Sequence, residues 1–196
     1  MFIFSEELLA AGTFMYKGNY DMVHRISENE IQQLYETYQT PEHVIAHCRE
    51  VTRVAYGIAE QLNRHGYHLD LELIRGAGLA HDVARTSDEH WNVGAEILLG
   101  LGYADEAEIV RNHMFYQFNP VDRLCENDMV CFGDRLVKEH DYVGVDERFA
   151  YIMAKAKDKP GAQERLIERR EEMRSLLNQI EEIIGVTMDA LFKQEK

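Results

Sequence analysis

Residues 40–66 read TPEHVIAHCREVTRVAYGIAEQLNRHG, and their apolar side chains recur at intervals of three and four. Positions at this spacing lie on the same side of an α-helix. Pro41 suits the first turn of such a helix, where its missing N–H is not needed, and Gly66 ends the pattern. The stretch therefore predicts one long amphipathic helix. The residues on its apolar face are Val44, His47, Val51, Val54 and Ile58.

The rest of the sequence predicts further helices and no series of strands. Ser27 and Glu30 have the spacing of a capping box, and Asp70 and Asp88 are each placed to cap a later helix. The other expected helices are one from about Asp105 to Met114, one through Val130–Val137, one from about Asp146, and a long one after Pro160 that Gly185 interrupts before Thr187 caps a last turn. We therefore expect an all-α fold, a helical bundle with a C-terminal helical extension.

The long helix after Pro160 carries a narrow apolar stripe among many charged residues. A stripe of this kind usually packs on the core, so we expect the helix to brace the bundle. The alternative is a partner-binding or dimerising pair of helices, which makes a homodimer a candidate assembly. The stripe consists of Leu166, Met173, Leu177, Ile180 and Ile184.

Length and composition indicate a soluble globular protein with one sizeable core. The 196 residues are 45% hydrophobic and 29% charged, which is ordinary for one domain. The formal net charge is −14, from 21 basic and 35 acidic residues. Such a surface repels polyanions, so we expect neither a nucleic-acid polymer nor a membrane as partner.

The cysteines and the N-terminus favour a cytoplasmic protein. Cys48, Cys125 and Cys131 are odd in number and lack CxxC spacing, which favours reduced thiols over a disulfide framework. The first residues carry Glu6 and Glu7 and no basic stretch, so they make a poor signal peptide. No apolar run approaches the roughly 20 residues that cross a bilayer.

Four residues on or near apolar helix faces can bind a metal ion. His47 shares the stripe of residues 40–66, His81 and Asp82 are adjacent near the C-terminal part of the third expected helix, and Asp134 lies within Val130–Val137. One buried polar residue is usually only hydrogen-bonded, but four in this order on three core helices favour coordination. Imidazole and carboxylate together suit divalent Mn, Fe, Co, Ni or Zn, with Mg as a further candidate.

The order His47…His81-Asp82…Asp134 resembles the H…HD…D pattern of HD-superfamily metal-dependent phosphohydrolases. The strings TPEHVIAHCREV, LAHDVAR and FGDRLV support the resemblance, which covers residues 41–138. It implies an HD-domain helical bundle and an enzyme, a phosphomonoesterase or phosphodiesterase, acting on a nucleotide or other small phosphate ester. It also implies that the four residues bind the catalytic metal.

The same resemblance implies further site residues. His90 and His113 are candidate ligands of a second ion with Asp82 between the two ions, although His90 is also compatible with a surface residue at a helix start. Arg85 follows Asp82 by three residues and resembles the basic residue that contacts substrate phosphate. The alternative for Arg85 is a cation favoured by the helix dipole. We expect Asp82, His81 and Arg85 to be catalytic and Arg85, His113 and Lys138 to bind substrate; Arg53 and Arg135 are weaker candidates.

A second resemblance extends along the strings EHWNVGAEILLGLGY, EIVRNH and VDERFAYIMAKAKDKPGAQERLIERR. They are similar to HD domains joined to molybdopterin-cytidylyltransferase-like nucleotidyltransferases. We expect an HD domain standing alone, because no glycine-rich nucleotidyltransferase segment precedes it in the sequence given. The expected organisation is an N-terminal extension at 1–26, an HD domain at 27–142, and C-terminal helices at 143–196 packed on the same domain.

Two alternatives to phosphate-ester hydrolysis keep the same pocket. Some HD-fold proteins use a di-iron site for oxygen-dependent oxidation, and six ligands including His90 and His113 are compatible with that chemistry. The other alternative is a non-catalytic module that senses a nucleotide.

Overall fold

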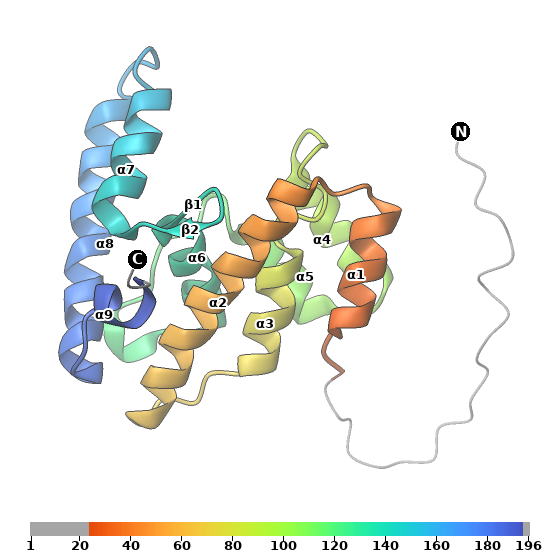
Figure 1. Cartoon of the computed structure of the whole chain (residues 1–196), viewed down its shortest axis with the longest axis horizontal. Coiled ribbons are helices and arrows are strands. Elements are labelled where there is room, and N and C mark those ends of the chain that lie inside the picture. The colour runs from red at the N-terminus through yellow and green to blue at the C-terminus, as the bar shows by residue number, and fades with distance from the viewer. Residues whose placement is uncertain (1–23, 194–196) are drawn as a thin grey trace, which may run out of the picture.

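The computed structural model describes residues 24–193, and helices make up nearly all of its regular structure (Figure 1). The all-α fold expected from the sequence is therefore confirmed. The helices are α1 (Glu28–Thr37), α2 (Glu42–Arg64), α3 (Leu71–Ala80), α4 (His90–Gly100), α5 (Ala104–Asn112), α6 (Glu126–Leu136), α7 (Gly144–Lys155), α8 (Ala162–Ile184) and α9 (Met188–Phe192). A 3-10 turn (Val121–Arg123) precedes α6.

Several helix ends lie where the sequence predicts them. Ser27 caps α1 in a full capping box, in which its backbone N–H donates to Glu30 and its hydroxyl accepts from the Glu30 N–H. Asp70 accepts hydrogen bonds from the first N–H groups of α3. Gly185 ends α8 in the left-handed conformation, and Thr187 caps α9.

The proposed ligands lie at the C-terminal end of α3, where the sequence indicated them. The helix ends at Ala80, and His81 and Asp82 follow directly. His81 keeps helical backbone angles, and consecutive turns continue the chain to residue 86. The carboxylate of Asp82 therefore contacts His90, the first residue of the next helix, α4.

Helix α4 begins later than the prediction at Asp88. Its first residue is His90, and the residue before it, Glu89, has a left-handed backbone with φ of 49° and makes no side-chain cap. This sharp turn brings His90 back toward the end of α3.

The core consists of two hydrophobic clusters. One cluster includes Val51, Phe132 and Ile180 and joins α2, α3, α6, α8 and α9. The other cluster includes Ile31 and Leu98 and joins α1 with α4 and α5. Ala77 belongs to the first cluster and Ala80 to the second. Helix α3 therefore runs from one cluster to the other and ends directly before His81.

Two glycines let α3 and α6 approach α2 closely. A Cβ on Gly78 would lie 2.7 Å from the Thr52 hydroxyl oxygen, and one on Gly133 would lie 2.5 Å from the Val51 carbonyl oxygen. Both distances are shorter than atomic contact allows. The absence of side chains at these positions therefore brings His81 and Asp134 close to α2, which carries His47.

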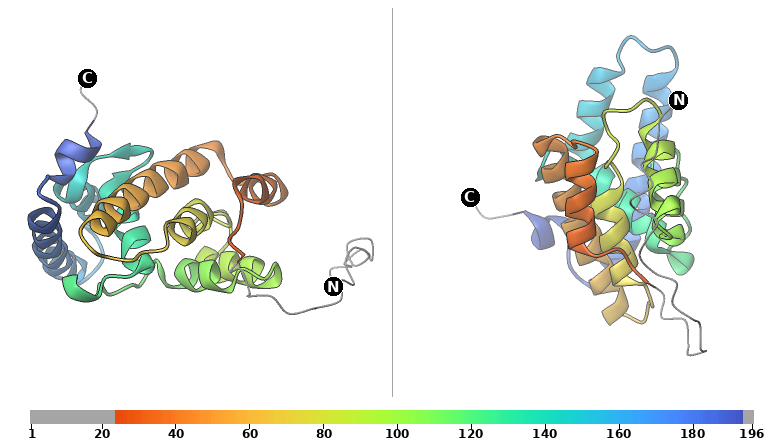
Figure 2. Two further views of the ribbon diagram at one scale, coloured as in Figure 1. Left: turned by 90° about the horizontal axis from the view of Figure 1, so that it is seen from below. Right: turned by 90° about the vertical axis from the view of Figure 1, so that its right-hand side faces the viewer.

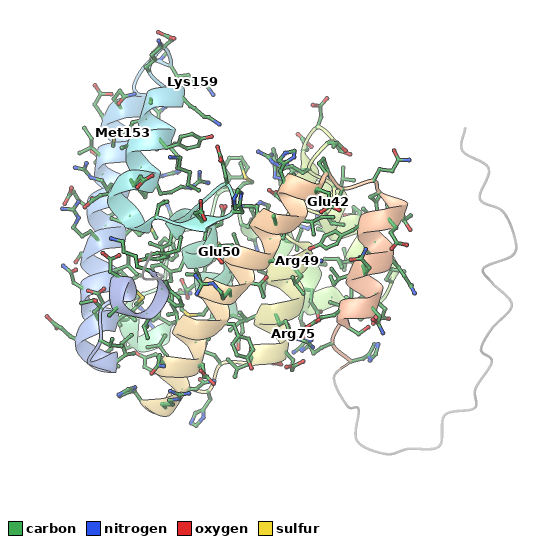
Figure 3. The ribbon with its side chains drawn as sticks, viewed as in Figure 1. Glu42, Arg49, Glu50, Arg75, Met153 and Lys159 are labelled. Carbon is green, nitrogen blue, oxygen red and sulfur yellow. The ribbon has the colours of Figure 1, made fainter. Side chains whose placement is uncertain are left out.

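Helices α7 and α8 form an antiparallel hairpin along one side of the protein, as the views in Figures 1 and 2 agree. Phe149 of α7 and Met173 and Ile180 of α8 are buried in the same cluster as α2. The C-terminal helices therefore brace the core, as the apolar stripe predicted. Figure 3 labels Lys159 in the turn at the far end of this hairpin.

A small antiparallel hairpin follows α6. Strands β1 (Val137–Lys138) and β2 (Asp141–Tyr142) pair Val137 with Tyr142 and Lys138 with Asp141. Strands of two residues leave no alternating pattern in a sequence, so this hairpin was not predicted. Glu139 in its turn has a left-handed backbone with φ of 57°.

Two sequence-based expectations concern the termini and the membrane. Of the N-terminal extension expected at residues 1–26, residues 1–23 lie outside the described part of the chain. The segment that makes a poor signal peptide lies among them. Among the helices of residues 24–193, none combines the length and apolar character that a bilayer crossing requires.

Candidate metal centre

The structure brings together the four residues that the sequence singled out. His47 comes from α2, His81 and Asp82 from the turn after α3, and Asp134 from α6. Ligand atoms of His47, His81 and Asp82 all lie within 4.8 Å of one another. Asp134 joins this group through His47, whose Nε2 lies 3.2 Å from its Oδ1.

Three histidines are held in one tautomer by the backbone. In each, Nδ1 lies at hydrogen-bond distance from a carbonyl oxygen, and because a carbonyl only accepts, Nδ1 carries the proton. Nε2 is then the ring atom that can bind a metal ion, the arrangement typical of metal-binding histidines. The pairs are His47 with Glu139 at 2.7 Å, His81 with Gly78 at 2.8 Å and His113 with Val110 at 2.7 Å.

One of the ligand atoms, Nε2 of His81, is buried without a hydrogen-bond partner, and the His81 side chain is only 1% exposed. Oδ1 of Asp82 is buried as well, with Nε2 of His90 at 3.0 Å. A buried polar atom left unpaired is costly and rare in folded proteins. A cation bound between His81 and Asp82 would satisfy Nε2 of His81, so the residues present fit a divalent metal ion.

The protonation states also suit coordination. Burial lowers the pKa of His81 to about 4, so its ring is neutral at pH 7. Burial alone would raise the pKa of the Asp82 carboxyl, but the neighbouring imidazoles of His81, His113 and His90 hold it far below its usual range. The pKa of Asp134 is likewise lowered, against burial, by its contact with His47. Both carboxylates are therefore ionised and ready to bind a cation.

His47 and His113 titrate in the opposite direction. Burial would lower their pKa values, but the contact with Asp134 raises the pKa of His47, and the contact with Asp82 raises that of His113. In the metal-free protein these two rings therefore hold protons more firmly than an ordinary histidine. A metal ion that bound them would displace those protons.

A second group of ligand atoms shares Asp82. Atoms of Asp82, His90 and His113 lie within 4.8 Å of one another. The Oδ1 atom of Asp82 is 3.0 Å from Nε2 of His90 and 3.7 Å from Nε2 of His113. Asp82 thus lies between two sets of histidines, a geometry suited to one ion or to two ions with this carboxylate between them.

Arg85 contacts this second group from the solvent side. Its Nε lies 3.4 Å from Oδ2 of Asp82, and its Nη1 lies 3.1 Å from Nδ1 of His90. Because a guanidinium only donates, Nδ1 of His90 is the acceptor. His90 is therefore held in the opposite tautomer from the other three histidines, with its Nε2 proton toward Asp82.

A pocket of about 460 Å³ opens onto the metal centre. All the candidate ligands except the more deeply buried His81 line this pocket. Arg85 lines it too. Lys138, a predicted substrate-binding residue, does not line the pocket; its ammonium pairs with Glu147 at 3.1 Å. Arg53 also lies elsewhere, paired with Glu50 on the outer face of α2.

Four cations of the pocket lining were missed or ranked low from the sequence. Arg148 from α7 is the nearest to the ligands, with Nη2 3.7 Å from Oδ1 of Asp134 and Nε donating to the Asp134 carbonyl oxygen at 3.3 Å. Arg135 lies on α6 beside Asp134, whereas only the packing of α7 and α8 on the bundle brings the other three to the pocket, so no local pattern could identify those three. The four are Arg135, Arg148, Lys155 and Arg169.

Comparisons with known proteins agree with this geometry. A protein-family model described as "HD domain" matches residues 44–182. An uncharacterized protein of Methanocaldococcus jannaschii is 40% identical over 72 residues, which make up 35% of this chain and 43% of that protein. The chain thus spans less than half the length of this curated relative. No solved structure matches the chain.

Proposed function

Because the chain belongs to the HD domain family, whose members are generally metal-dependent hydrolases, we propose that it hydrolyses a small phosphate ester, and specifically a nucleotide. The observation that carries this proposal is the unpartnered buried Nε2 atom of His81, which lies within reach of His47 and of the Asp82 carboxylate. An apolar core tolerates such an atom where a cation binds it.

The ligand assignment follows from the tautomers. His47, His81, Asp82 and Asp134 would hold the first ion, and His113, with His90 after a change of tautomer, would hold a second ion against Asp82. Mn, Fe, Co, Ni, Zn and Mg are all candidates. When bound, such an ion supplies a Lewis acid that lowers the pKa of a water molecule and offsets charge on the phosphoryl oxygens.

The two carboxylates have a positioning role in this proposal. The pKa values of Asp82 and Asp134 are held far below the usual range, so both are weak bases near neutral pH. They can accept hydrogen bonds from the attacking water and orient it, but they are poorly suited to take its proton. Arg85, half-exposed at the pocket mouth, is placed to bind phosphate oxygens.

The charge of the pocket supports an anionic substrate. The protein as a whole carries a formal charge of −14, yet five arginine and lysine side chains line this pocket against three acidic ones. A local excess of positive charge on an acidic protein concentrates anions at the pocket. The cations are Arg85, Arg135, Arg148, Lys155 and Arg169, and the acids are Asp82, Asp134 and Glu139.

The direct test is hydrolysis of a panel of phosphomonoesters and phosphodiesters, with nucleotides among them, in the presence of Mn²⁺, Co²⁺ or Ni²⁺. We expect metal-dependent release of phosphate or of nucleotide, and a loss of about 10²–10³-fold in kcat for Asp82→Ala, as for removal of a central electrostatic group. His68→Ala is the matched control, because His68 is exposed and lies outside the pocket. Unchanged activity in Asp82→Ala would contradict the assignment.

The same experiments separate the alternatives. Two iron ions per chain with oxygen consumption would favour the di-iron oxidation that six ligands permit. Tight nucleotide binding without turnover across all metals would favour a nucleotide sensor. A relation to HD domains joined to molybdopterin-cytidylyltransferase-like proteins stays a prediction, as does a homodimer.

A further inference from the structure

A second pocket adjoins the metal pocket. It has a volume of about 650 Å³ and shares three lining residues with the metal pocket, namely Arg135, Phe149 and Arg169. One of its walls is the chain between α5 and α6, and the opposite wall is α8. The two pockets are therefore neighbouring chambers of one cleft, with two arginines where they meet.

Arg135 is held in place without a carboxylate partner. Its guanidinium stacks over Phe118 at 4.7 Å from the ring centroid, and its Nη2 donates to the Tyr116 carbonyl oxygen at 3.1 Å. Phe118 in turn stacks on the buried Phe132 at 4.3 Å. Within residues 24–193 no acidic group lies at ion-pair distance from Arg135, so its positive charge is fixed in position and uncompensated.

Arg169 adds a second uncompensated charge on the facing helix. It is exposed on α8 and, among the residues that the structure describes, forms no ion pair, whereas its neighbour Arg170 pairs with Glu171 at 2.9 Å. Two guanidinium groups lining the same junction repel each other unless an anion lies near them. Arginine is well suited to bind an oxyanion with paired N–H groups.

The second chamber has the lining expected for a flat ring with polar edges. Apolar faces come from Phe118, Met173 and Leu176. The polar groups include the side-chain amides of Gln117 and Gln179 and the carboxylate of Glu172. Ligand sites commonly combine mostly apolar walls with a few polar groups that fix orientation. The chamber is large enough for a ring system that extends beyond the metal pocket.

We propose that this second chamber binds the leaving-group side of the substrate, and that Arg135 and Arg169 bind a second phosphate of the same molecule. The inference rests on the proposed phosphohydrolase activity and deepens it. The preferred substrate is then a nucleoside diphosphate or triphosphate, with its terminal phosphoryl group at the metal centre and its base in the second chamber. Water attacks the terminal phosphorus, the bond to the bridging oxygen breaks, and the products are inorganic phosphate, a nucleotide shorter by one phosphate, and a proton.

The test compares ADP with p-nitrophenyl phosphate on the metal-loaded full-length protein. The second compound offers one phosphate and no group for Arg135 and Arg169. Losing a charge-assisted hydrogen bond costs about 1.5–3 kcal/mol, which is a change of about tenfold or more. We therefore expect Arg169→Gln to raise the KM for ADP at least about tenfold, and to change that for p-nitrophenyl phosphate far less. Arg170→Gln, one residue along α8 and outside both chambers, is the matched control and should leave both unchanged.

A second variant tests the chamber itself and leaves both arginines unchanged. Ser175 is exposed and lines only the second chamber, so Ser175→Trp should obstruct the base. It should lower kcat/KM for ADP at least about tenfold more than for p-nitrophenyl phosphate, by the same arithmetic. Parallel changes for both substrates in Arg169→Gln and Ser175→Trp would overturn the inference.

Calorimetric binding of ADP separates this inference from the proposed function. Hydrolysis of p-nitrophenyl phosphate by a protein that neither binds nor hydrolyses ADP would overturn the second-phosphate site and leave the phosphohydrolase standing. ADP binding that Arg169→Gln weakens, with no hydrolysis of any substrate by any metal, would support the site and contradict the hydrolase.

Discussion

The Nε2 atom of His47 lies 3.2 Å from Oδ1 of Asp134, so α2 and α6 are joined at the metal centre by an imidazole–carboxylate pair. The contact raises the pKa of His47 and lowers that of Asp134, in each case against the effect of burial. In the metal-free protein the Asp134 carboxylate therefore stabilises a proton on Nε2 of His47, and a metal ion bound there would replace that proton.

The first prediction concerns this pair without metal. Asp134→Asn removes the carboxylate and leaves the burial, so the pKa of His47 should fall from above 6.5 to below 6.5. Proton NMR titration of the histidine rings in the chelator-treated protein measures the change, and the exposed His68 serves as internal reference. A His47 ring that titrated at the same pH in both proteins would show that the carboxylate does not hold its proton.

A second prediction concerns metal removal. A ligand present at 100 times its Kd stabilises the folded state by about 2.7 kcal/mol, so adding metal to the chelated protein should raise its Tm. His81→Ala removes the most deeply buried ligand of the group and should abolish most of that increase. The exposed His68→Ala should keep it. An equal metal-dependent rise in Tm for His81→Ala would mean that the ion binds elsewhere.

A third prediction asks whether the second group of ligands holds its own ion. Trp91 is the only tryptophan, and its ring centroid lies 5.2 Å from that of His90. A Co²⁺ or Ni²⁺ ion bound by Asp82, His90 and His113 should quench Trp91 fluorescence, because both ions quench nearby fluorophores. Quenching that persists in His47→Ala and disappears in His90→Ala would establish a separate second ion, whereas its persistence in His90→Ala would exclude His90 as a ligand.

The sequence predicts the fold well because the main helices carry their own signals. The spacing of Val44, Val51 and Ile58 identifies α2, and Ser27 identifies the start of α1. The start of α4 lies at His90 rather than directly after Asp88, since Glu89 adopts a left-handed backbone, and consecutive local turns connect α3 to α4. The β1–β2 hairpin was missed because its strands have two residues each.

The site was predictable only where residues lie on the core helices. His47, His81 and Asp134 stand out in sequence because a polar residue interrupts or borders an apolar stripe. Arg148 and Arg169 lie on charged faces of α7 and α8, where any of several cations fits the pattern equally well. Their position at the pocket follows from packing between distant segments, and this information is absent from local spacing.

A fourth prediction concerns the close approach of α6 to α2. A methyl group on Gly133 would lie 2.5 Å from the Val51 carbonyl oxygen and 3.2 Å from its carbon, so the backbone itself must move. Overpacking of this kind costs about 1–3 kcal/mol, and it would displace the neighbouring Asp134. We expect Gly133→Ala to lower both Tm and metal affinity. Gly100→Ala is the control, because nothing lies within 4 Å of its added methyl group; a Gly133→Ala protein as stable as that control would contradict the packing argument.

The last prediction concerns acid stability and lies away from the metal centre. Hydrogen bonds from Ser27 and Tyr103 lower the pKa of Glu30 to about 2, from 4.5 in an unfolded chain. A carboxyl whose pKa is lowered in the folded state stabilises the protein at pH values above its unfolded-state pKa, and that stability is lost as the pH falls from 4.5 toward 2.

Glu30→Gln removes the charge and half of the capping box, which should cost about 1 kcal/mol at pH 7. The difference in Tm between the wild type and Glu30→Gln should therefore be largest at neutral pH and shrink steadily below pH 4.5. Gln32→Glu, on the exposed face of the same helix, controls for a general change in helix charge. If the difference between the wild type and Glu30→Gln were the same at pH 7 and pH 3, the stabilisation would not come from the ionised carboxyl.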